Sequence, residues 1–453
     1  MPVKTTKRSK RVNLMDPRLT DEDISRICNE HYGSIPGTDF AAKLIEAVQA
    51  INQGIYPELI SEGSSGSYLV KNLGKEKIAV FKPKDEEPYG SLNPKFMKWI
   101  QRMCSPCCFG RSCLVPNQGY LCEAGASLVD QKLSLNIVPK TAVVSLSSPT
   151  FNYSSVHRAM ARTKERISYR YVRPSKNIRH IGLPRKASNL FRGSFQLFMN
   201  GYQEGNNLIR QWELFPEKAP PPSVMSEFQL EFEKMVILDY LIRNTDRGNN
   251  WLIKYNFKRK DYLVKKEIIQ GMEMKNKEDL ETNSDSKLLE LIEENNNVSI
   301  KIAAIDNGLA FPFKHPDECR AYPYHWAELP IAQHPFSEEI INKILPLIDN
   351  TDFVKELGNE IKKIFECDKS FRKRIFDRQL SVIRGQMFNL REALRKRKSP
   401  AQLVQMTPRY MIEVKIKKKR KFPKFSKKGK ENKEIEEPQV KDKVVDDLHE
   451  EER

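Results

Sequence analysis

The chain has 453 residues, of which 39% are hydrophobic and 30% charged, with 27 Pro, 20 Gly and a formal net charge of +18. This composition excludes collagen, a coiled coil and a chain that is disordered throughout, and the length allows two or three compact units. The excess of positive charge predicts an anionic partner, which on charge alone is either a nucleic acid or an acidic membrane surface.

The sequence contains no uninterrupted apolar stretch of about 20 residues, the length that spans a bilayer, and its N-terminus has no apolar core typical of a secretory signal. We therefore expect the protein on the cytosolic side. Five of its eight cysteines fall between Cys104 and Cys122. Eight are too few for a disulfide framework in a chain of this length, so we expect reduced thiols.

The N-terminal part of the chain predicts an arm, a helix and three strands. Residues 1–38 are polar with a Lys/Arg cluster, which predicts a disordered basic arm. Apolar residues then recur every three or four positions from Phe40 to Ile51, which predicts a short helix. Alternating patterns next predict strands at 59–62, 68–71 and 78–82, with a Gly/Ser loop at 63–67 between the first two and Lys82 on the third.

Further along, a helix is predicted at 94–103, where one face is apolar and another is basic. A helix is next predicted at about 226–243, where it leads to Asp246, and a strand at 251–255. A charged and Asn-rich insertion follows at 256–299, and a further strand is predicted from 300. The chain ends with a predicted helix through Leu390 and Leu394 and a tail at 407–453 that is first basic and then acidic.

Four features occur in an order that is typical of kinases: the Gly/Ser loop, Lys82, Asp246 after a long helix, and Asp306 followed by Asn-Gly. Phosphoryl transfer depends on positioning and charge, which are supplied by a loop over the phosphates, a Lys, a base and metal-holding Asp and Asn side chains. Alone, the loop is typical of a hairpin turn, Lys82 of a solvated strand residue and Asp306 of a turn. Their order favours a kinase.

Several motifs carry a resemblance to a known family. They are SEGSSGSY at 61–68, AVFKPK at 79–84, EPYG at 87–90, SFQLF at 194–198, RNTDRGN at 243–249, AAIDNGLAFP at 303–312 and HPD at 315–317. Over about residues 40–406 the chain closely resembles the type II phosphatidylinositol 4-kinases.

The resemblance implies an α+β, two-lobed, protein-kinase-like lipid kinase fold, with an antiparallel sheet in the N-lobe and a mostly helical C-lobe. We expect the N-lobe, with a cysteine-rich membrane-anchoring segment, at 39–198 and the C-lobe, with the insertion 256–299, at 199–406. The tail 407–453 is expected to be disordered. The implied reaction transfers the γ-phosphate of ATP to the 4-hydroxyl of phosphatidylinositol, giving phosphatidylinositol 4-phosphate on membranes, with ATP and Mg²⁺ as cofactors.

The same resemblance implies roles for individual residues. Loop 61–67 would cover the ATP phosphates, 196–199 would form the hinge at adenine, and Asp246 would face the inositol hydroxyl. The ATP-binding residues are then Ser61, Glu62, Gly63, Ser64, Ser65, Gly66, Ser67, Lys82, Gln196, Leu197, Phe198, Met199 and Asp306; the catalytic residues are Asp246, Arg247, Asn249 and Asn250; and the metal ligands are Asp306 and Asn250. The acidic partner of Lys82 is left open between Glu123 and Asp130.

Cysteines at the end of the predicted helix 94–103 resemble the family's palmitoylated cluster. Cys104, Cys107 and Cys108 are the candidate sites, although Ser105 stands where the family has another Cys. An acyl chain beside an interfacial helix that carries Lys95 and Trp99 supplies the two signals that stable anchoring requires. Zinc is the alternative, with Cys104, Cys107, Cys113 and Cys122 as ligands, although the second pair is widely spaced.

Lys314, Arg320, Tyr324 and Trp326 are predicted to contact lipid, because basic side chains suit headgroup phosphate and amphipathic aromatic residues suit the membrane interface. Core packing of the aromatic residues is the alternative. Cys319 and Glu328 stand where the family usually has Trp, which predicts shallower insertion.

We expect a monomer whose partner is phosphatidylinositol in anionic membranes rather than nucleic acid. The expected location is the cytosolic face of trans-Golgi, endosomal or plasma membranes, with a cytosolic pool. The ten Lys or Arg residues at 415–430 suit an acidic leaflet, a nucleic acid or a localisation signal.

One departure from the family concerns the catalytic loop. Kinases place the metal-binding Asn five residues beyond the catalytic Asp. Here Asn249 and Asn250 lie only three and four residues beyond Asp246. One residue of the family's pattern is missing, so either the loop has a different geometry or one metal site is weakened. A catalytically weak kinase-fold membrane scaffold is therefore the alternative function.

Overall fold

A computed structural model describes residues 20, 26, 35–88, 90, 92–93, 111–152, 191–248, 250–255, 299–415 and 440–445. The chain forms two compact units. The first takes its described residues from 1–228 and 249–308, and the second from 229–248 and 309–453. These units differ from the predicted lobes, because residues 199–228 and 249–308 belong to the first unit.

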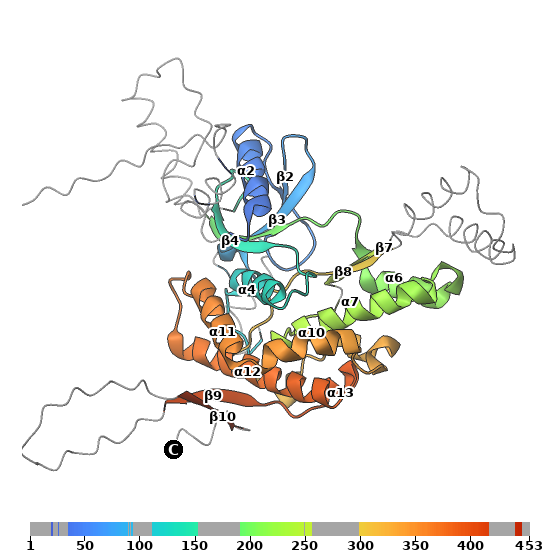
Figure 1. Ribbon diagram of the computed structural model, residues 1–453. Helices are drawn as coiled ribbons and strands as arrows, with labels where there is room; N and C mark the ends of the chain where they lie inside the picture. Colours follow the sequence, from blue (N-terminus) through green and yellow to red (C-terminus); the bar gives the residue numbers. More distant parts are fainter. Residues whose placement is uncertain are drawn as a thin grey trace, which may run out of the picture. The chain divides into compact units, whose positions relative to one another are not determined.

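The first unit is built on a five-stranded antiparallel sheet (Figure 1). The strands expected at 68–71 and 78–82 form, and Lys82 lies on the latter. In place of the strand expected at 59–62 there is a two-residue strand at Glu58–Leu59, and residues 60–62 are not in a strand. The strand order is β1 (Glu58–Leu59), β2 (Tyr68–Lys71), β3 (Lys77–Pro83), β5 (Phe191–Leu197) and β4 (Thr141–Leu146).

Two helices pack on this sheet. The expected helix forms as α2 (Thr38–Asn52), whose apolar stripe of Phe40, Leu44 and Ala47 enters one core with β2, β3 and β5. Helix α4 (Gly119–Lys132) lies along β4 and β5. Its hydrophobic pattern is weak because it is buried nearly all round, which explains why the sequence did not reveal it. The short helix η1 (Lys84–Glu86) follows β3.

The rest of the first unit holds a second antiparallel sheet in the order β6 (Gln203–Glu204), β7 (Trp251–Tyr255) and β8 (Ile300–Ala304). The strands predicted at 251–255 and from 300 are therefore confirmed. Helices α6 (Gly205–Leu214) and η2 (Pro216–Lys218) precede α7 (Pro222–Leu241), which is the helix predicted at 226–243 and continues into the second unit.

The second unit is mainly helical. Its elements are η3 (Glu318–Arg320), η4 (His325–Glu328), η5 (Pro330–Gln333), α10 (Glu338–Asp349), α11 (Thr351–Phe365), α12 (Lys373–Arg395) and α13 (Pro400–Val404). Ser337, Asn350 and Ser399 accept backbone N–H groups at the starts of α10, α11 and α13, so each helix begins at a polar cap. The helix predicted through Leu390 and Leu394 is α12. None of the described helices is long and apolar enough to cross a bilayer.

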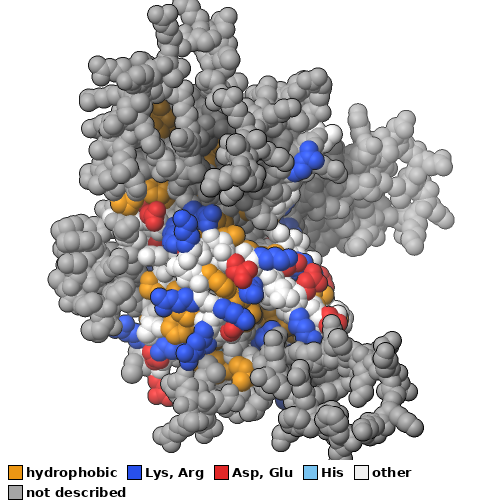
Figure 2. Space-filling view, turned by 90° about the vertical axis from the view of Figure 1, so that its left-hand side faces the viewer, with side chains coloured by type: hydrophobic (Ala, Val, Ile, Leu, Met, Phe, Trp, Pro, Cys, Tyr) orange, Lys and Arg blue, Asp and Glu red, His pale blue; other side chains and the backbone are white. Residues whose placement is uncertain are grey.

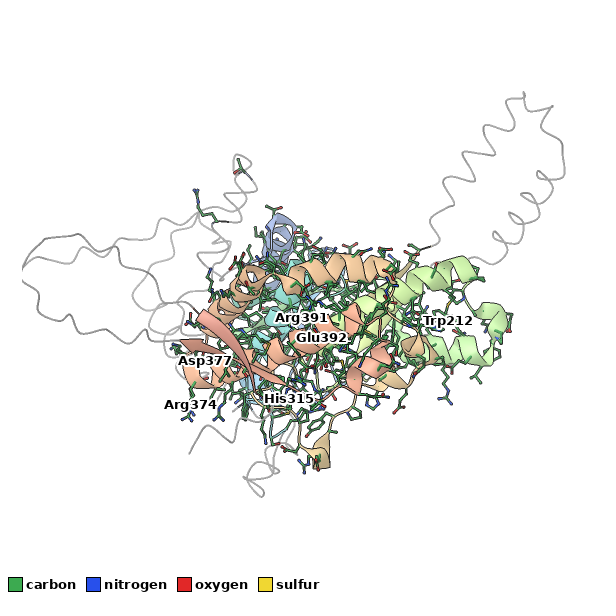
Figure 3. The ribbon with its side chains drawn as sticks, turned by 60° about the horizontal axis from the view of Figure 1, so that its bottom comes forward. Trp212, His315, Arg374, Asp377, Arg391 and Glu392 are labelled. Atoms are coloured by element: carbon green, nitrogen blue, oxygen red, sulfur yellow. The ribbon has the colours of Figure 1, made fainter. Side chains whose placement is uncertain are left out.

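Two strands interrupt the tail that was expected to be disordered from 407 onward. Strand β9 (Tyr410–Lys415) pairs antiparallel with β10 (Val440–Val445). The β-branched residues of both segments favour this pairing. His315, which Figure 3 labels, ties β9 to the unit. Its backbone N–H donates to the Tyr410 hydroxyl at 3.0 Å, and its ring meets the Tyr410 ring edge-on.

We predict that Gly385→Ala destabilises the second unit. Gly385 lies on α12 where β9 crosses it, and an added Cβ would overlap the carbonyl oxygen of Arg409. The free energy of unfolding should fall by roughly 1–3 kcal/mol in denaturant titrations. The control Gly358→Ala, where the added Cβ would meet Leu380 side-chain carbons at 3.6 and 3.7 Å, should instead gain about 0.5–1 kcal/mol from helix propensity. Equal stability of the two variants would contradict the close approach.

Candidate functional site

The first unit holds a lysine between two carboxylates. Lys82 Nζ, on β3, lies 2.6 Å from Glu123 Oε1 on α4 and 2.7 Å from Asp306 Oδ1, which follows β8. The side chain of Glu123 is 2% exposed, that of Lys82 17% and that of Asp306 53%. Burial therefore increases from the solvent-facing Asp306 to Glu123. Asp130, the other candidate partner, instead accepts the backbone N–H groups of Ile137 and Val138.

The two carboxylates keep Lys82 charged. Burial on its own lowers the pKa of Lys82, but attraction to Asp306 and Glu123 outweighs burial and raises that pKa above its ordinary value. Burial raises the pKa of Glu123, and the attraction of Lys82 opposes this rise. The result is a fixed ammonium group with one exposed carboxylate beside it, an arrangement that suits an anionic ligand and a cation.

The predicted phosphate loop has a fixed base and an exposed tip. Gly66 is buried against Glu86: its N–H donates to the Glu86 carbonyl at 2.9 Å, and a Cβ added to Gly66 would overlap the Glu86 side chain. Asn93 Nδ2 donates to the carbonyl of Ser64 at 3.1 Å and to that of Glu87 at 2.8 Å. Residues 61–64 remain exposed. The tip of the loop is therefore exposed to solvent, while hydrogen bonds hold its base.

Glu87 caps the helix that carries Glu123. Its Oε1 accepts the N–H of Tyr120 at 2.7 Å and its Oε2 accepts the N–H of Gly119 at 3.2 Å, at the first two residues of α4. A carboxylate suits the positive end of the helix dipole. Burial nevertheless raises the pKa of Glu87 to about 7, against the opposing effect of these two hydrogen bonds. Glu123 lies one turn further along the same helix.

The predicted hinge continues from β5. Gln196 is buried and donates to Thr141 Oγ1 at 3.1 Å, while the N–H groups of Leu197 and Phe198 donate to the carbonyls of Lys140 and Ile78 at 3.0 and 2.9 Å. The hinge is therefore anchored to both neighbouring segments.

The structure brings the two predicted metal ligands to adjacent segments. The carbonyl of Asn250 accepts the N–H of Ile305 at 3.1 Å, one residue before Asp306. Asp306 has a left-handed backbone, with φ of 55°, which Asp tolerates better than most residues. Among the described residues no group of three His, Cys, Asp or Glu side chains could hold a metal by itself. In kinases, substrate phosphates and water complete the coordination shell of Mg²⁺. A site with one carboxylate and one amide from the protein therefore fits this ion.

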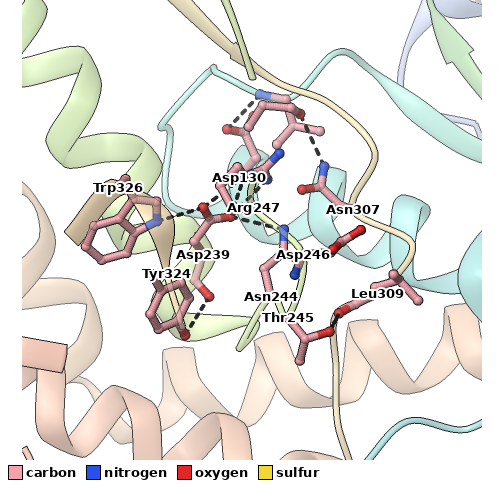
Figure 4. A network of polar contacts seen from close by, with 12 residues as sticks. Asp130, Asp239, Asn244, Thr245, Asp246, Arg247, Asn307, Leu309, Tyr324 and Trp326 are labelled. Atoms are coloured by element: carbon pink, nitrogen blue, oxygen red, sulfur yellow. Dashed lines mark hydrogen bonds and ion pairs between the residues drawn. The ribbon is translucent and has the colours of Figure 1, made fainter. Parts of the chain in front are cut away.

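In the second unit, a buried network surrounds Asp246 (Figure 4). The backbone N–H of Asp246 donates to Asn244 Oδ1 at 3.0 Å. Arg247 is fully buried and forms a bidentate pair with Asp239 on α7, with Nη2–Oδ1 and Nε–Oδ2 distances of 2.9 Å. Asp246 itself is half-buried. The loop therefore presents one partly exposed carboxylate between two anchored neighbours. Asn249 lies outside the described residues.

The prediction that Tyr324 and Trp326 contact lipid is wrong. Their side chains are 4% and 2% exposed, because they stack on each other and the Trp326 indole donates to Asp239 Oδ2 at 3.1 Å. Both meet α7, and this is the core packing that was the alternative. Lys314 and Arg320 do reach solvent, and Lys314 pairs with Asp317.

The predicted anchoring residues Lys95, Trp99, Cys104, Cys107 and Cys108 lie outside the described residues. Of the four cysteines considered as zinc ligands, Cys113 and Cys122 are buried thiols. Both predictions for this segment remain predictions.

Sequence reasoning missed the roles of Glu86, Glu87 and Asp239. Glu87 stood in a motif to which no role was given, and Asp239 stood in the apolar repeat of the helix predicted at 226–243. A carboxylate within an apolar stripe was the signal, because a buried charge requires partners.

Comparisons with known proteins show what the chain is similar to. A family model described as "Phosphatidylinositol 3- and 4-kinase" matches residues 63–380. A mouse protein named phosphatidylinositol 4-kinase type 2-beta is 51% identical over 81% of this chain and 72% of its own length. A zebrafish protein named phosphatidylinositol 4-kinase type 2-alpha is 49% identical over 82% of this chain and 76% of its own. Among solved structures, hydra Fam20 with sugar gives a TM-score of 0.41 at 11% identity, covering 84% of this chain and 95% of its own.

The raised pKa of Glu87 predicts a pH-dependent stability. Between pH of about 5 and 7 the folded chain keeps the proton on Glu87 while the unfolded chain releases it, so the wild type should lose stability as pH rises. Relative to Glu87→Gln, which cannot titrate, the loss should be roughly 2–3 kcal/mol. Denaturant titrations at pH 5 and pH 8 measure it. A stability difference between the two proteins that does not change with pH would exclude this linkage.

Proposed function

The chain belongs to the phosphatidylinositol 3- and 4-kinase family, and on this premise we propose how its residues carry out the reaction. The protein is a phosphatidylinositol 4-kinase, which transfers the γ-phosphate of ATP to the 4-hydroxyl of phosphatidylinositol. As a member of a kinase family it uses ATP and a divalent metal. The observation that carries the residue assignments is the Lys82 ammonium held between Glu123 and Asp306.

In the first unit, ATP binds with its phosphates beneath residues 61–67 and against Lys82. The charged Lys82 attracts the phosphate oxygens, and Glu123 holds its amine in place. Adenine lies along the hinge 196–199. Because the N–H groups of Leu197 and Phe198 are engaged within the protein, the backbone of Met199 and the hinge carbonyls contact the base.

Mg²⁺ is the divalent metal we assign. Asp306 supplies a carboxylate and Asn250 an amide, both hard oxygen ligands of the kind Mg²⁺ prefers. When bound, the ion neutralises charge that develops on the transferred phosphoryl group. The side chain of Asp306 is 53% exposed, which supports this assignment, because a carboxylate that holds a metal ion together with substrate phosphates must be accessible from solvent.

Asp246 is the residue assigned to the acceptor. Its carboxylate orients the inositol 4-hydroxyl and accepts the hydroxyl proton as the 4-oxygen forms its bond to the γ-phosphorus. The bond from the γ-phosphorus to the β,γ-bridging oxygen breaks, and ADP leaves with the electron pair. Asn244 and Arg247 hold the loop on either side of it. Asn249 belongs to the same loop by sequence.

Lys82→Ala and Asp306→Ala should each reduce ATP-dependent labelling of phosphatidylinositol vesicles by at least about 100-fold. Lys82→Ala removes a positive charge beside the phosphates, and Asp306→Ala removes the carboxylate assigned to hold the divalent metal. The control Lys140→Ala removes a lysine from an exposed ion pair with Asp39 and should leave labelling unchanged. Circular dichroism and thermal melting confirm that the variants fold.

Undiminished labelling by either variant would remove its assignment. A wild type that gives no labelled phosphatidylinositol 4-phosphate would instead favour the membrane scaffold.

Membrane attachment is the second part of the proposal. We infer that the chain acts as a monomer on phosphatidylinositol in anionic membranes, at the cytosolic face of trans-Golgi, endosomal or plasma membranes. Palmitoylated Cys104, Cys107 and Cys108 anchor it, beside Lys95 and Trp99, and Lys314 and Arg320 add contacts to headgroups. Binding to an anionic surface is supported by the net charge of +18 and by the Lys and Arg side chains that are interspersed over the face in Figure 2.

The triple variant Cys104→Ser/Cys107→Ser/Cys108→Ser should lose palmitate labelling in cells. Its membrane-bound fraction should fall at least about tenfold, since one signal alone anchors weakly. Cys367→Ser is the matched control, because Cys367 is an exposed cysteine outside the cluster. Palmitate labelling of the triple variant at the wild-type level would assign the acyl sites elsewhere.

A further inference from the structure

Asp239 is the centre of the buried network in the second unit (Figure 4). Its side chain is fully buried on α7, and so is that of Arg247. Oδ1 accepts from Arg247 Nη2 at 2.9 Å and from Asn244 Nδ2 at 3.3 Å. Oδ2 accepts from Arg247 Nε at 2.9 Å and from Trp326 Nε1 at 3.1 Å. Three side chains from two segments therefore converge on one carboxylate.

Two of these three side chains flank Asp246. Arg247 is the next residue, and Asn244 accepts the Asp246 N–H through its Oδ1 while its Nδ2 donates to Asp239. The main chain is held as well, since the N–H of Asn244 donates to the Asp239 carbonyl at 2.9 Å. Asp239 thus fixes the backbone on both sides of Asp246 without reaching its carboxylate.

The third side chain, Trp326, comes from η4, far along the sequence. Its ring stacks on Tyr324 with centroids 4.9 Å apart and meets Phe232 edge-on. The Tyr324 hydroxyl donates to the Asp239 carbonyl at 3.3 Å. Segment 324–326 therefore packs onto α7. Among the described residues, its Trp326 indole is the one donor to the Asp239 carboxylate that does not come from the loop 244–247.

We propose that Asp239, oriented by the indole N–H of Trp326, is the positioning residue that sets Asp246 for phosphoryl transfer. This inference rests on the proposed role of Asp246. An ionised carboxylate with well-aligned donors on both oxygens has one preferred rotation. Without the Trp326 donor, Oδ2 keeps only the Arg247 Nε bond, and the carboxylate can turn toward the guanidinium. The longest contact, that to Asn244, then weakens first, and with it the hold on the Asp246 N–H.

Trp326→Phe tests this directly, because it keeps an aromatic ring in the stack and removes the donor. Trp212→Phe is the matched control: Trp212 is also buried, packs edge-on against Phe228 and Tyr255, and lies on α6 in the first unit (Figure 3). We expect kcat on phosphatidylinositol vesicles to fall roughly tenfold in Trp326→Phe, the equivalent of one hydrogen bond to a charge. The KM for ATP should stay within about twofold, because Lys82 and Asp306 are untouched.

A second variant separates positioning from general loosening. Asn244→Ala breaks the next link, so it should give the same kcat-selective loss, and the double variant Trp326→Phe/Asn244→Ala should be no slower than Asn244→Ala alone. Asp239→Asn leaves Arg247 buried without its counter-charge, and where it fails to fold the other two variants carry the test. Three outcomes would overturn the proposal. The losses of kcat in the two single variants could multiply in the double variant, the KM for ATP could rise as much as kcat falls, or Trp326→Phe could have the same kcat as Trp212→Phe.

Failure of the inference is distinguishable from failure of the assigned role of Asp246. If Asp246→Asn abolishes labelling while Trp326→Phe does not change kcat, Asp246 keeps its role and the positioning by Asp239 is wrong. If Asp246→Asn labels phosphatidylinositol at the wild-type rate, the assigned role itself is wrong.

Discussion

The first unit depends on keeping one ammonium group charged where little water reaches it. An isolated Lys in such a place would lose its proton, because desolvation favours the neutral form. Glu123 and Asp306 prevent this, and they do so from positions 41 and 224 residues away in the chain. To satisfy Lys82, strand β3, helix α4 and the end of strand β8 must meet. The ion pair is thus a condition on the fold of the unit as well as a feature of its site.

The second unit meets the same constraint with the signs reversed. There the buried charge on the helix is Asp239, and the loop brings the guanidinium to it. Removing one member of such a pair leaves a buried charge without a partner, which costs roughly 3–5 kcal/mol. Each unit therefore holds the carboxylate to which we assign a role in the reaction. Asp306 is a partly exposed partner of Lys82, and Asp246 is the partly exposed neighbour of the buried Arg247–Asp239 pair. Positioning, the main task of a protein in phosphoryl transfer, follows from charge burial.

The sequence predicted the parts whose signals are local. Periodicity or turn chemistry was enough to recognise Lys82 on its strand, the helix before Asp246 and the turn at Asp306. The family motifs then showed that these parts belong to one kinase. The choice between Glu123 and Asp130 could not be made, because both lie on α4 and the decision depends on which face of that helix meets β3. Trp326 was misassigned since an amphipathic aromatic residue suits a membrane interface and a buried polar partner equally. Only the position of Asp239 decides between these two roles of Trp326, and Asp239 lies 87 residues away in the sequence.

The shortened catalytic loop can be understood from the same anchors. Asn244, Thr245 and Arg247 are tied within the second unit, where Thr245 donates from both its N–H and its hydroxyl to the Leu309 carbonyl. Asn250 is tied to Ile305 in the first unit. The contacts that hold Asn244, Thr245 and Arg247 are made within the second unit, and the contact that holds the Asn250 carbonyl is made within the first. The described neighbours of Asp246 and the described contact of Asn250 are therefore each satisfied without the additional residue of the family's pattern.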